Sequence, residues 1–305
     1  MRELFWNASE GRLRAGWRLL LAFFATGMAA WGVGTVLAAV AGGGLWVGVV
    51  AATIGITSGV WAASRGLDRR PLVDLGLRID REWWADLAFG LALGVALAGV
   101  VFTMEIVLGW VVVTGHTVDS SPDLGFVPMF LATTALFVAV AWYEELAFRG
   151  YLICNLAEGT RGLWGRRSAV AAGVVASAAL FSAGHAANPN ATVEGAVGIL
   201  AAGLLIGFAY AWTGSLALPI GLHVTWNLAQ GAIFGLPVSG VTTPARWIVV
   251  EERGPDLWTG GPFGPEAGLT GVAAMAIGAA AVFVWVRLRR GEVSLRLSIA
   301  EPPDR

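Results

Sequence analysis

Six polar side chains that can take part in hydrolysis stand inside three apolar segments of this chain. They comprise two carboxylates, a guanidinium, two imidazoles and a carboxamide: Glu144, Glu145, Arg149, His185, His223 and Asn227. An ionisable group at bilayer depth costs at least ~2.5–3.5 kcal/mol, so it is a functional-site hypothesis by default. A carboxylate can take a proton from water, and nitrogen donors can stabilise an oxyanion. Together these groups predict a site that activates water.

The first segment contains a pair of acids with different local partners. Glu145 and Arg149 are separated by four residues with the acid first, the favourable order on a helix, so they can neutralise one another. Glu144 lies about 100° away around the helix and has no such partner. We expect Glu144 to face an interior cavity as a general base. The alternative is a salt bridge at a helix end, with Glu144 extending to the membrane interface.

The other two segments each place a histidine one helical turn from a second residue. His185 follows Phe181 by four residues, and Asn227 follows His223 by four, so each pair shares a helix face. Pro219 removes a backbone hydrogen bond before His223, which predicts a kink. A single membrane histidine or asparagine can also serve only as an interhelical hydrogen bonder, so each residue alone leaves that alternative open.

Two further reactive residues are expected to have no role in the site. His116 falls in a polar outer loop with Asp119 and Asp123, where we expect it to be solvated. Cys154 is the single cysteine and lies in an apolar stretch, which favours a packing role and excludes an intramolecular disulfide or a cysteine metal cluster.

The composition indicates what must position these residues. Of the 305 residues 56% are hydrophobic and 13% are charged, with a mean hydropathy of +0.69. Soluble domains carry about 25% charged residues, so we expect an integral membrane protein. The net charge of −1 gives no reason to expect a nucleic-acid partner. The first apolar run, 19–40, exceeds the ~7–15 residues of a cleavable signal, which predicts an uncleaved first span.

Eight segments are apolar and long enough to suggest membrane spans, each needing ~20 residues. They are 17–41, 44–64, 86–114, 126–148, 168–187, 195–213, 215–235 and 267–288. The fold class predicted is an all-α, polytopic helical bundle of about eight transmembrane helices around a central polar catalytic cavity. The whole chain, 1–305, is expected to form a single integral membrane domain.

The distribution of arginine predicts the orientation of these spans, because cytoplasmic loops carry the excess of positive charge. Arginines cluster before the first span, in loop 65–85, around Arg161 and after the last span, whereas loop 236–266 has few. We therefore expect both termini and loop 65–85 to be cytoplasmic and loop 236–266 to be extracytoplasmic. The absence of lysine favours a high-GC genome, and hence a prokaryotic cytoplasmic membrane.

Taken in order, the motifs resemble those of a known family. Glu-Glu-x-x-x-Arg at 144–149, Phe-x-x-x-His at 181–185 and His-x-x-x-Asn at 223–227 resemble the CAAX protease and bacteriocin-processing (CPBP or Abi) family. This family includes the type II CAAX prenyl endopeptidases. The resemblance covers about 126–235, which we interpret as the catalytic core.

The resemblance implies an intramembrane endopeptidase that cleaves a membrane-associated peptide or protein. Glu144 and His185 would hold and activate water, while His223 and Asn227 would stabilise the oxyanion. The supporting residues would be Glu145, Arg149 and Phe181. The resemblance favours a glutamate-dependent mechanism without a bound metal, and it leaves the metal dependence open. If a divalent metal such as zinc is present, Glu144, His185 and His223 are the predicted ligands.

Two other function classes fit some of these residues. A catalytically silent membrane scaffold or immunity-type protein could retain the same motifs as a polar core. A haem- or quinone-binding protein could use His185 and His223 as ligands, but would leave Glu-Glu-x-x-x-Arg unexplained. A transporter is disfavoured because the other spans are nearly free of polar residues.

One geometric condition must hold for the peptidase hypothesis. Straight spans would place Glu144 in the cytoplasmic half of the fourth helix and His185 at the outer end of the fifth. The two meet only if the fourth helix extends to about Leu156, or if the fifth is bent or displaced. We expect Glu144, His185, His223 and Asn227 to line one polar pocket.

Overall fold

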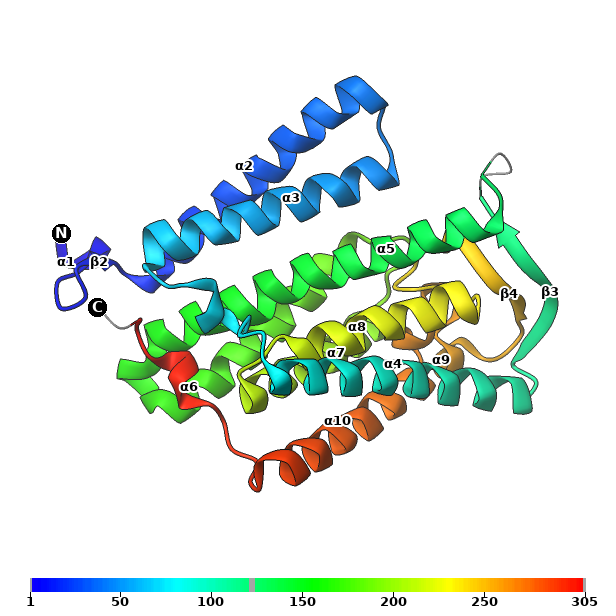
Figure 1. Cartoon of the computed structure of the whole chain (residues 1–305). Helices are drawn as coiled ribbons and strands as arrows, with labels where there is room; N and C mark the ends of the chain where they lie inside the picture. Colours follow the sequence, from blue (N-terminus) through cyan, green and yellow to red (C-terminus); the bar gives the residue numbers. More distant parts are fainter. Residues whose placement is uncertain (1, 121–123, 304–305) are drawn as a thin grey trace.

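The computed structural model describes residues 2–120 and 124–303, so Asp123 and Arg305 lie outside the described residues. Its long helices form one bundle (Figure 1). They are α2 (Ala15–Ala41), α3 (Leu45–Ala63), α4 (Arg81–Val107), α5 (Phe126–Glu144), α6 (Cys154–Gly184), α7 (Val193–Thr213), α8 (Ala217–Asn227) and α10 (Leu269–Arg290). The helices α1 (Arg2–Phe5) and α9 (Asp256–Thr259) are short. The expected all-α membrane bundle is confirmed.

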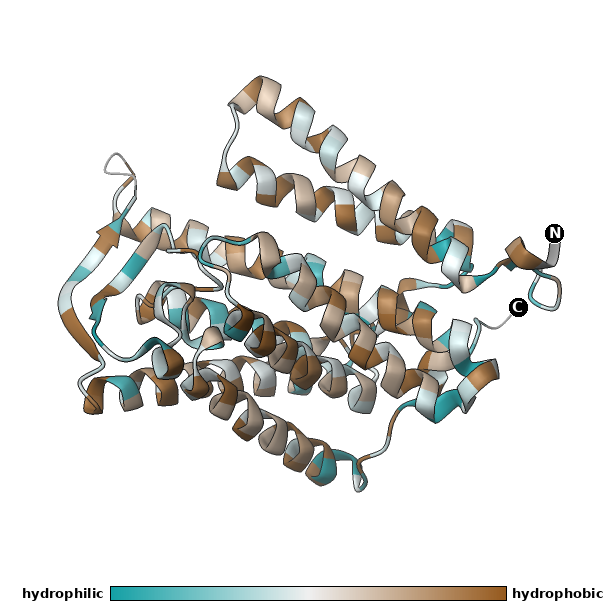
Figure 2. Ribbon diagram, turned by 180° about the vertical axis from the view of Figure 1, so that it is seen from behind, coloured by the Kyte–Doolittle hydropathy of each residue, from teal (hydrophilic) through white to brown (hydrophobic). Residues whose placement is uncertain are grey.

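Six helical runs in the described ranges are long and apolar enough to cross a membrane. Each of the eight expected segments overlaps one of the eight helices named first above, but the count of eight spans is not confirmed. The run Phe126–Ala187 counts once although the chain turns within it, and α8 is only 11 residues long. Figure 2 shows that hydrophobic residues predominate along these helices.

The third expected span, 86–114, extends beyond the end of the helix that the structure shows there. Helix α4 stops at Val107, and β3 (Val111–Asp119) pairs antiparallel with β4 (Ala245–Glu252). The run Val-Val-Val-Thr is β-branched, a composition that favours strands, and hydropathy alone does not separate strand from helix. The loops expected at both places therefore contain a two-stranded sheet, which lies at one end of the bundle (Figure 1). A second, shorter pair joins β1 (Trp6–Asn7) and β2 (Arg12–Leu13).

A long helix that turns back on itself carries two of the motifs. Helix α5 continues through a π-helical stretch, Glu145–Ile153, into α6, and the chain reverses at Gly165. Gly165 has φ 75° and ψ 158°, a left-handed backbone that glycine adopts without steric cost. The two arms pack side by side, since the Ser177 hydroxyl donates to the Phe148 carbonyl at 2.8 Å.

This reversal brings Glu144 and His185 to the same level. Glu144 lies 21 residues before Gly165 and His185 lies 20 residues after it. At 1.5 Å per residue, both are about 30 Å from the turn along antiparallel arms. The extension expected to about Leu156 is therefore present and runs further, to the turn at Gly165.

Helix α8 lies at the centre of the bundle, and α4 packs along it. Leu93 and Leu97 of α4 share an apolar cluster with Leu218 and Leu222 of α8. The hydroxyl of Thr225 also donates to the Leu91 carbonyl at 2.8 Å. By contrast, the α2–α3 hairpin diverges from α5 towards its tip (Figure 1), and the apolar stretch of α2 is only 6% buried.

Buried ion pairs join the N-terminal segment to the long helix. Arg12 and Arg70 donate to the Glu158 carboxylate at 2.7 and 3.0 Å, and Arg18 donates to the same group. These three arginines are at most 4% exposed, although charge patterning places them among solvated cytoplasmic residues. Strand β2 and the C-terminal segment drawn in red lie at the end of the bundle opposite β3 and β4 (Figure 1).

Candidate active site

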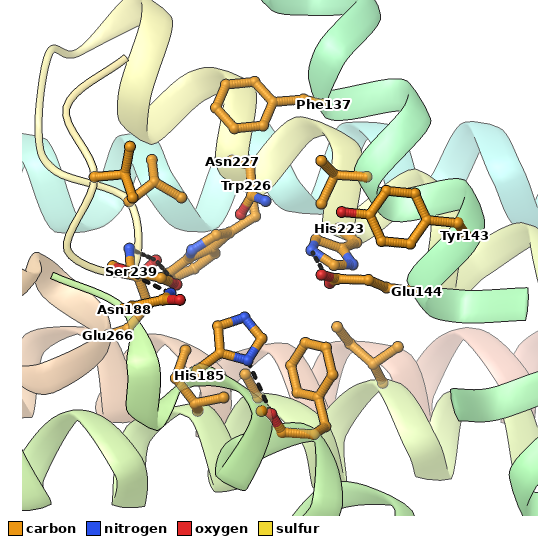
Figure 3. Close-up of a pocket in the computed structure, with 18 of the residues that line it drawn as sticks. Phe137, Tyr143, Glu144, His185, Asn188, His223, Trp226, Asn227, Ser239 and Glu266 are labelled. Atoms are coloured by element: carbon orange, nitrogen blue, oxygen red, sulfur yellow. Dashed lines mark hydrogen bonds and ion pairs between the residues drawn. The ribbon is translucent and has the colours of Figure 1, made fainter. Parts of the chain in front are cut away.

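One cavity contains all four residues that were expected to converge. Glu144, His185, His223 and Asn227 line a pocket of about 540 Å³ inside the bundle (Figure 3). They come from α5, the end of α6 and α8, so the site requires three separate helices. The placement of His185 on the same cavity as Glu144 satisfies the geometric condition for a shared site.

The pocket is less polar than expected. Most of its lining is apolar, with α3, α5 and α7 contributing side chains such as Val49, Val140 and Ile199. The polar groups gather in two places, separated across the view of Figure 3. The expectation of a polar pocket is wrong for the walls, because only short motif segments carry polar residues in these apolar helices.

A fully buried ion pair, Glu145 with Arg149, lies next to the residues that line the cavity. The Arg149 guanidinium lies 2.9 Å from the Glu145 carboxylate, and both side chains are 0% exposed. Arg149 also lies over the Phe181 ring, 4.3 Å from its centroid, a cation–π arrangement. Burying either charge alone would be costly, so each makes the position of the other tolerable.

His223 lies between the two glutamates. Its Nδ1 is 2.8 Å from Glu145 Oε1, and its Nε2 is 3.7 Å from Glu144 Oε2. Glu145 already accepts from Arg149 as a carboxylate, so His223 Nδ1 is the donor. This hydrogen bond fixes the ring and directs Nε2 towards Glu144 and the cavity.

Glu144 is the open member of the pair. Its Oε2 has no hydrogen-bond partner within the described structure, and its side chain is 17% exposed, facing the cavity (Figure 3). The alternative in which Glu144 extends to the membrane interface does not describe this geometry. Glu144 therefore has the position that a base needs to contact a water molecule in the pocket.

His185 faces the same cavity from a 3₁₀ turn, His185–Ala187, at the end of α6. Its Nδ1 lies 2.8 Å from the Phe181 carbonyl, which can only accept, so Nδ1 donates and Nε2 is left for the cavity. The Phe181 ring lies 4.6 Å from the His185 ring and 6.2 Å from the His223 ring. Phe181 is thus the spacer between the two imidazoles.

Asn227 lies one turn beyond His223 on α8 and lines the cavity beside Trp226 (Figure 3). The kink expected at Pro219 is wrong. Pro219 is the third residue of α8, in the first turn, where a backbone N–H has no intrahelical acceptor to lose. Helix α8 therefore presents His223 and Asn227 from a regular segment.

The three residues predicted as ligands only if a metal is present are not grouped as a metal site. In residues 2–120 and 124–303, no three histidine, cysteine, aspartate or glutamate side chains are close enough to hold an ion. Glu144, His185 and His223 share the cavity but not a common coordination point, so the arrangement does not fit the ligand set expected for zinc.

His116 is exposed on strand β3 rather than in a loop.

The sequence analysis did not identify the second group of polar residues that lines the cavity. Asn188, Ser239 and Glu266 line the pocket away from Glu144 (Figure 3). Glu266 belongs to the segment before α10, where a charged residue in a Gly- and Pro-rich loop suggests solvation. The one feature of the sequence that could have indicated Glu266 as a buried residue is its position directly before the last apolar span.

Comparison with known proteins agrees with the motif analysis. Residues 126–229, about a third of the chain, match the family described as type II CAAX prenyl endopeptidase Rce1-like. No curated protein is similar enough to the chain to count as a match. The matched range begins with α5 and contains all three motifs, ending just after Asn227. The segment that contributes the three motifs to the cavity therefore matches an Rce1-like domain, and the predicted family is confirmed.

Proposed function

We propose that this integral membrane protein is an intramembrane endopeptidase in which Glu144 activates the attacking water. The Rce1-like match supports a protease of the CAAX type. The observation that carries the specific assignment is the Glu144 carboxylate, which faces the cavity with one oxygen unpartnered and lies 3.7 Å from His223 Nε2. The proposed catalytic core is 126–235.

In the first step, Glu144 accepts a proton from water, and the hydroxide oxygen bonds to the carbon of the scissile carbonyl. His185 Nε2 is free to accept a hydrogen bond from the same water, because Nδ1 is already used at Phe181. Together Glu144 and His185 would hold the water in the orientation that the attack requires.

In the second step, negative charge develops on the carbonyl oxygen. The Asn227 amide can donate to it in any protonation state. His223 can donate from Nε2 only as the doubly protonated ring, whose charge would lie between Glu145 and Glu144. The proton held by Glu144 then passes to the leaving nitrogen, the C–N bond breaks, and a carboxylate and an amine result.

We propose that substrate reaches the cavity laterally from the lipid, between α3 and α5. Leu45 and Val49 of α3 and Leu136 and Val140 of α5 line the same pocket, and Val49, Leu136 and Val140 belong to one apolar cluster. The substrate is then a membrane-associated peptide or protein. The proposed orientation has both termini on the cytoplasmic side of a prokaryotic membrane, and a reporter fused after Arg290 that scored as external would overturn it.

The test is cleavage of fluorophore-labelled membrane peptides by purified protein in lipid nanodiscs. Glu144→Gln keeps the shape of the side chain but cannot serve as a base, so we expect kcat to fall by about 10²–10⁴-fold at unchanged thermal stability. Glu105→Gln is the matched control, since Glu105 is a fully buried acid outside the cavity. Normal turnover by Glu144→Gln would disprove the assignment, and cleavage of no peptide would favour the silent scaffold.

A further inference from the structure

A second carboxylate faces the cavity outside the family match and lacks a counter-cation. Glu266 is 3% exposed and lies in a 3₁₀ turn, Pro265–Ala267, before α10. No arginine or histidine nitrogen in the described part of the chain lies within ion-pair distance of it. Its partners are neutral: Gln230 Nε2 donates at 2.7 Å and the Ser239 backbone N–H at 3.3 Å.

The surroundings of Glu266 are built around it. Asn188 donates from Nδ2 to the Ser239 carbonyl at 2.9 Å, which fixes Ser239 at φ +46°, a backbone region rarely used by residues other than glycine. A Cβ at Gly198 of α7 would lie 1.5 Å from the Glu266 carbonyl oxygen, so only glycine lets the two backbones meet. The carboxylate is therefore held in place rather than carried on a free loop.

The cavity as a whole favours a positive ligand. Its described lining contains two carboxylates, Glu144 and Glu266, and no arginine, and the sequence contains no lysine. Figure 3 shows Glu266 with Asn188 and Ser239 on the opposite side of the view from Glu144 and His223. A peptide that reaches Glu144 can therefore extend towards Glu266 along the apolar floor of the pocket. An acidic group placed there would be repelled by both carboxylates.

We propose that Glu266, held by Gln230 and Ser239, is a specificity-determining subsite that binds a lysine or arginine side chain of the peptide substrate. The apolar walls accommodate the aliphatic stem of such a side chain, and the carboxylate pairs with its charged end. Burial raises the pKa of Glu266 to about 7, and an approaching cation favours the ionised form that pairs with it. The inference rests on the proposed function, because it supposes that a peptide occupies the cavity.

The test measures binding rather than turnover, so it does not depend on whether the protein cleaves peptides. The probes are fluorescent, apolar peptides with acetylated and amidated ends, each carrying one lysine, norleucine or glutamate whose position is moved along the chain. Binding is measured by anisotropy to the Glu144→Gln protein in nanodiscs, in which Glu266 is the remaining carboxylate of the cavity. At the best position we expect lysine to bind at least about tenfold more tightly than norleucine, and glutamate to bind most weakly.

Two double variants decide whether Glu266 causes the preference. Glu144→Gln with Glu266→Gln should bind the lysine and norleucine peptides equally, whereas Glu144→Gln with Glu105→Gln should keep the preference. Glu144→Gln with Glu266→Asp retains the charge and should keep part of the preference, which separates recognition from loss of the loop structure. An unchanged preference after Glu266→Gln, an equal loss in the Glu105 control, or no preference at any position would overturn the proposal.

Discussion

Two buried ionic clusters lie on the same long helical run, and they differ in whether a carboxylate is left open. One is centred on Glu144 and Glu145, the other on Glu158, 14 residues further along. In the second cluster Arg12 and Arg18 donate to one oxygen of Glu158, and Arg70 donates to the other. Both oxygens are therefore saturated, and the carboxylate has no free lone pair directed at a cavity.

The first cluster distributes its partners unequally. Glu145 Oε1 receives both Arg149 and His223, while Glu144 receives no arginine and has only His223 Nε2, at 3.7 Å, within ion-pair distance. Burial and charge are thus common to both clusters and do not mark a site. What distinguishes the site is a carboxylate that lines a cavity without an arginine partner, because its neighbour Glu145 takes Arg149.

The largest loss of stability should come from a substitution in the second cluster, the one centred on Glu158. Glu158→Gln removes the carboxylate that three buried arginines share and leaves them only Glu10, Asp68 and Asp74 as counter-charges, so we expect about 3–5 kcal/mol of destabilisation. The turnover of the fraction that remains folded should not change, because Glu158 does not line the cavity. Melting temperature and kcat, measured together in nanodiscs, check both expectations. Glu301→Gln is the control, since its pair with Arg166 is exposed and contributes about 0–1 kcal/mol.

Glu145→Gln should lower both the stability of the fold and the rate of cleavage. It leaves Arg149 buried without its counter-charge, which we expect to cost about 3 kcal/mol, and it weakens the hydrogen bond that orients His223. Adding Arg149→Met removes the uncompensated charge, so thermal stability should recover while cleavage stays low. If the double variant regained both, Glu145 would act on stability alone.

Glu266 should make stability depend on pH. Burial raises its pKa from 4.5 to about 7, so between these values the folded protein holds a proton that the unfolded chain has lost. The free energy of unfolding therefore falls as pH rises from about 4.5 to about 7, by up to about 3 kcal/mol from this group. Glu266→Gln should remove that slope.

Melting temperatures of wild type and Glu266→Gln at pH 5, 6, 7 and 8 would show the variant gaining relative stability as pH rises. The groups in contact with the carboxylate, Gln230 and Ser239, do not titrate in this range. His185, His223 and Glu144 share the cavity but are present in both proteins, so the difference isolates Glu266. Parallel pH curves would show that Glu266 has the same pKa in the folded and unfolded chains.

The smallest effect concerns the access of substrate to the cavity that Glu144 lines. Val49 packs with Val140 between α3 and α5, whereas its neighbour Val50 is 45% exposed on the outer face of α3. Val49→Trp should narrow the lateral opening and lower kcat/KM by about tenfold, or about 1.4 kcal/mol. Val50→Trp adds the same bulk towards lipid and should leave the rate unchanged. Equal rates for both variants would argue for access from another side.

The sequence by itself determined the all-α membrane bundle, the family and the four motif residues that line the cavity. Long apolar runs have few structural alternatives, because a helix satisfies its backbone polar groups within one segment. For the same reason, an acid such as Glu144 or an imidazole such as His223 stands out against its apolar surroundings. Both signals are local and need no knowledge of the tertiary structure.

Only the tertiary structure decided which charges are paired and which remain open. Arg12 and Glu158 are 146 residues apart, and Gln230 and Glu266 are 36 apart, so no local spacing reveals either contact. The level at which Glu144 meets His185 was fixed by the turn at Gly165, beyond the point where a single span would end. Strand β3 likewise formed because β4 was available to pair with it. Pairing, depth and cavity shape depend on long-range packing, which apolar patterning does not encode.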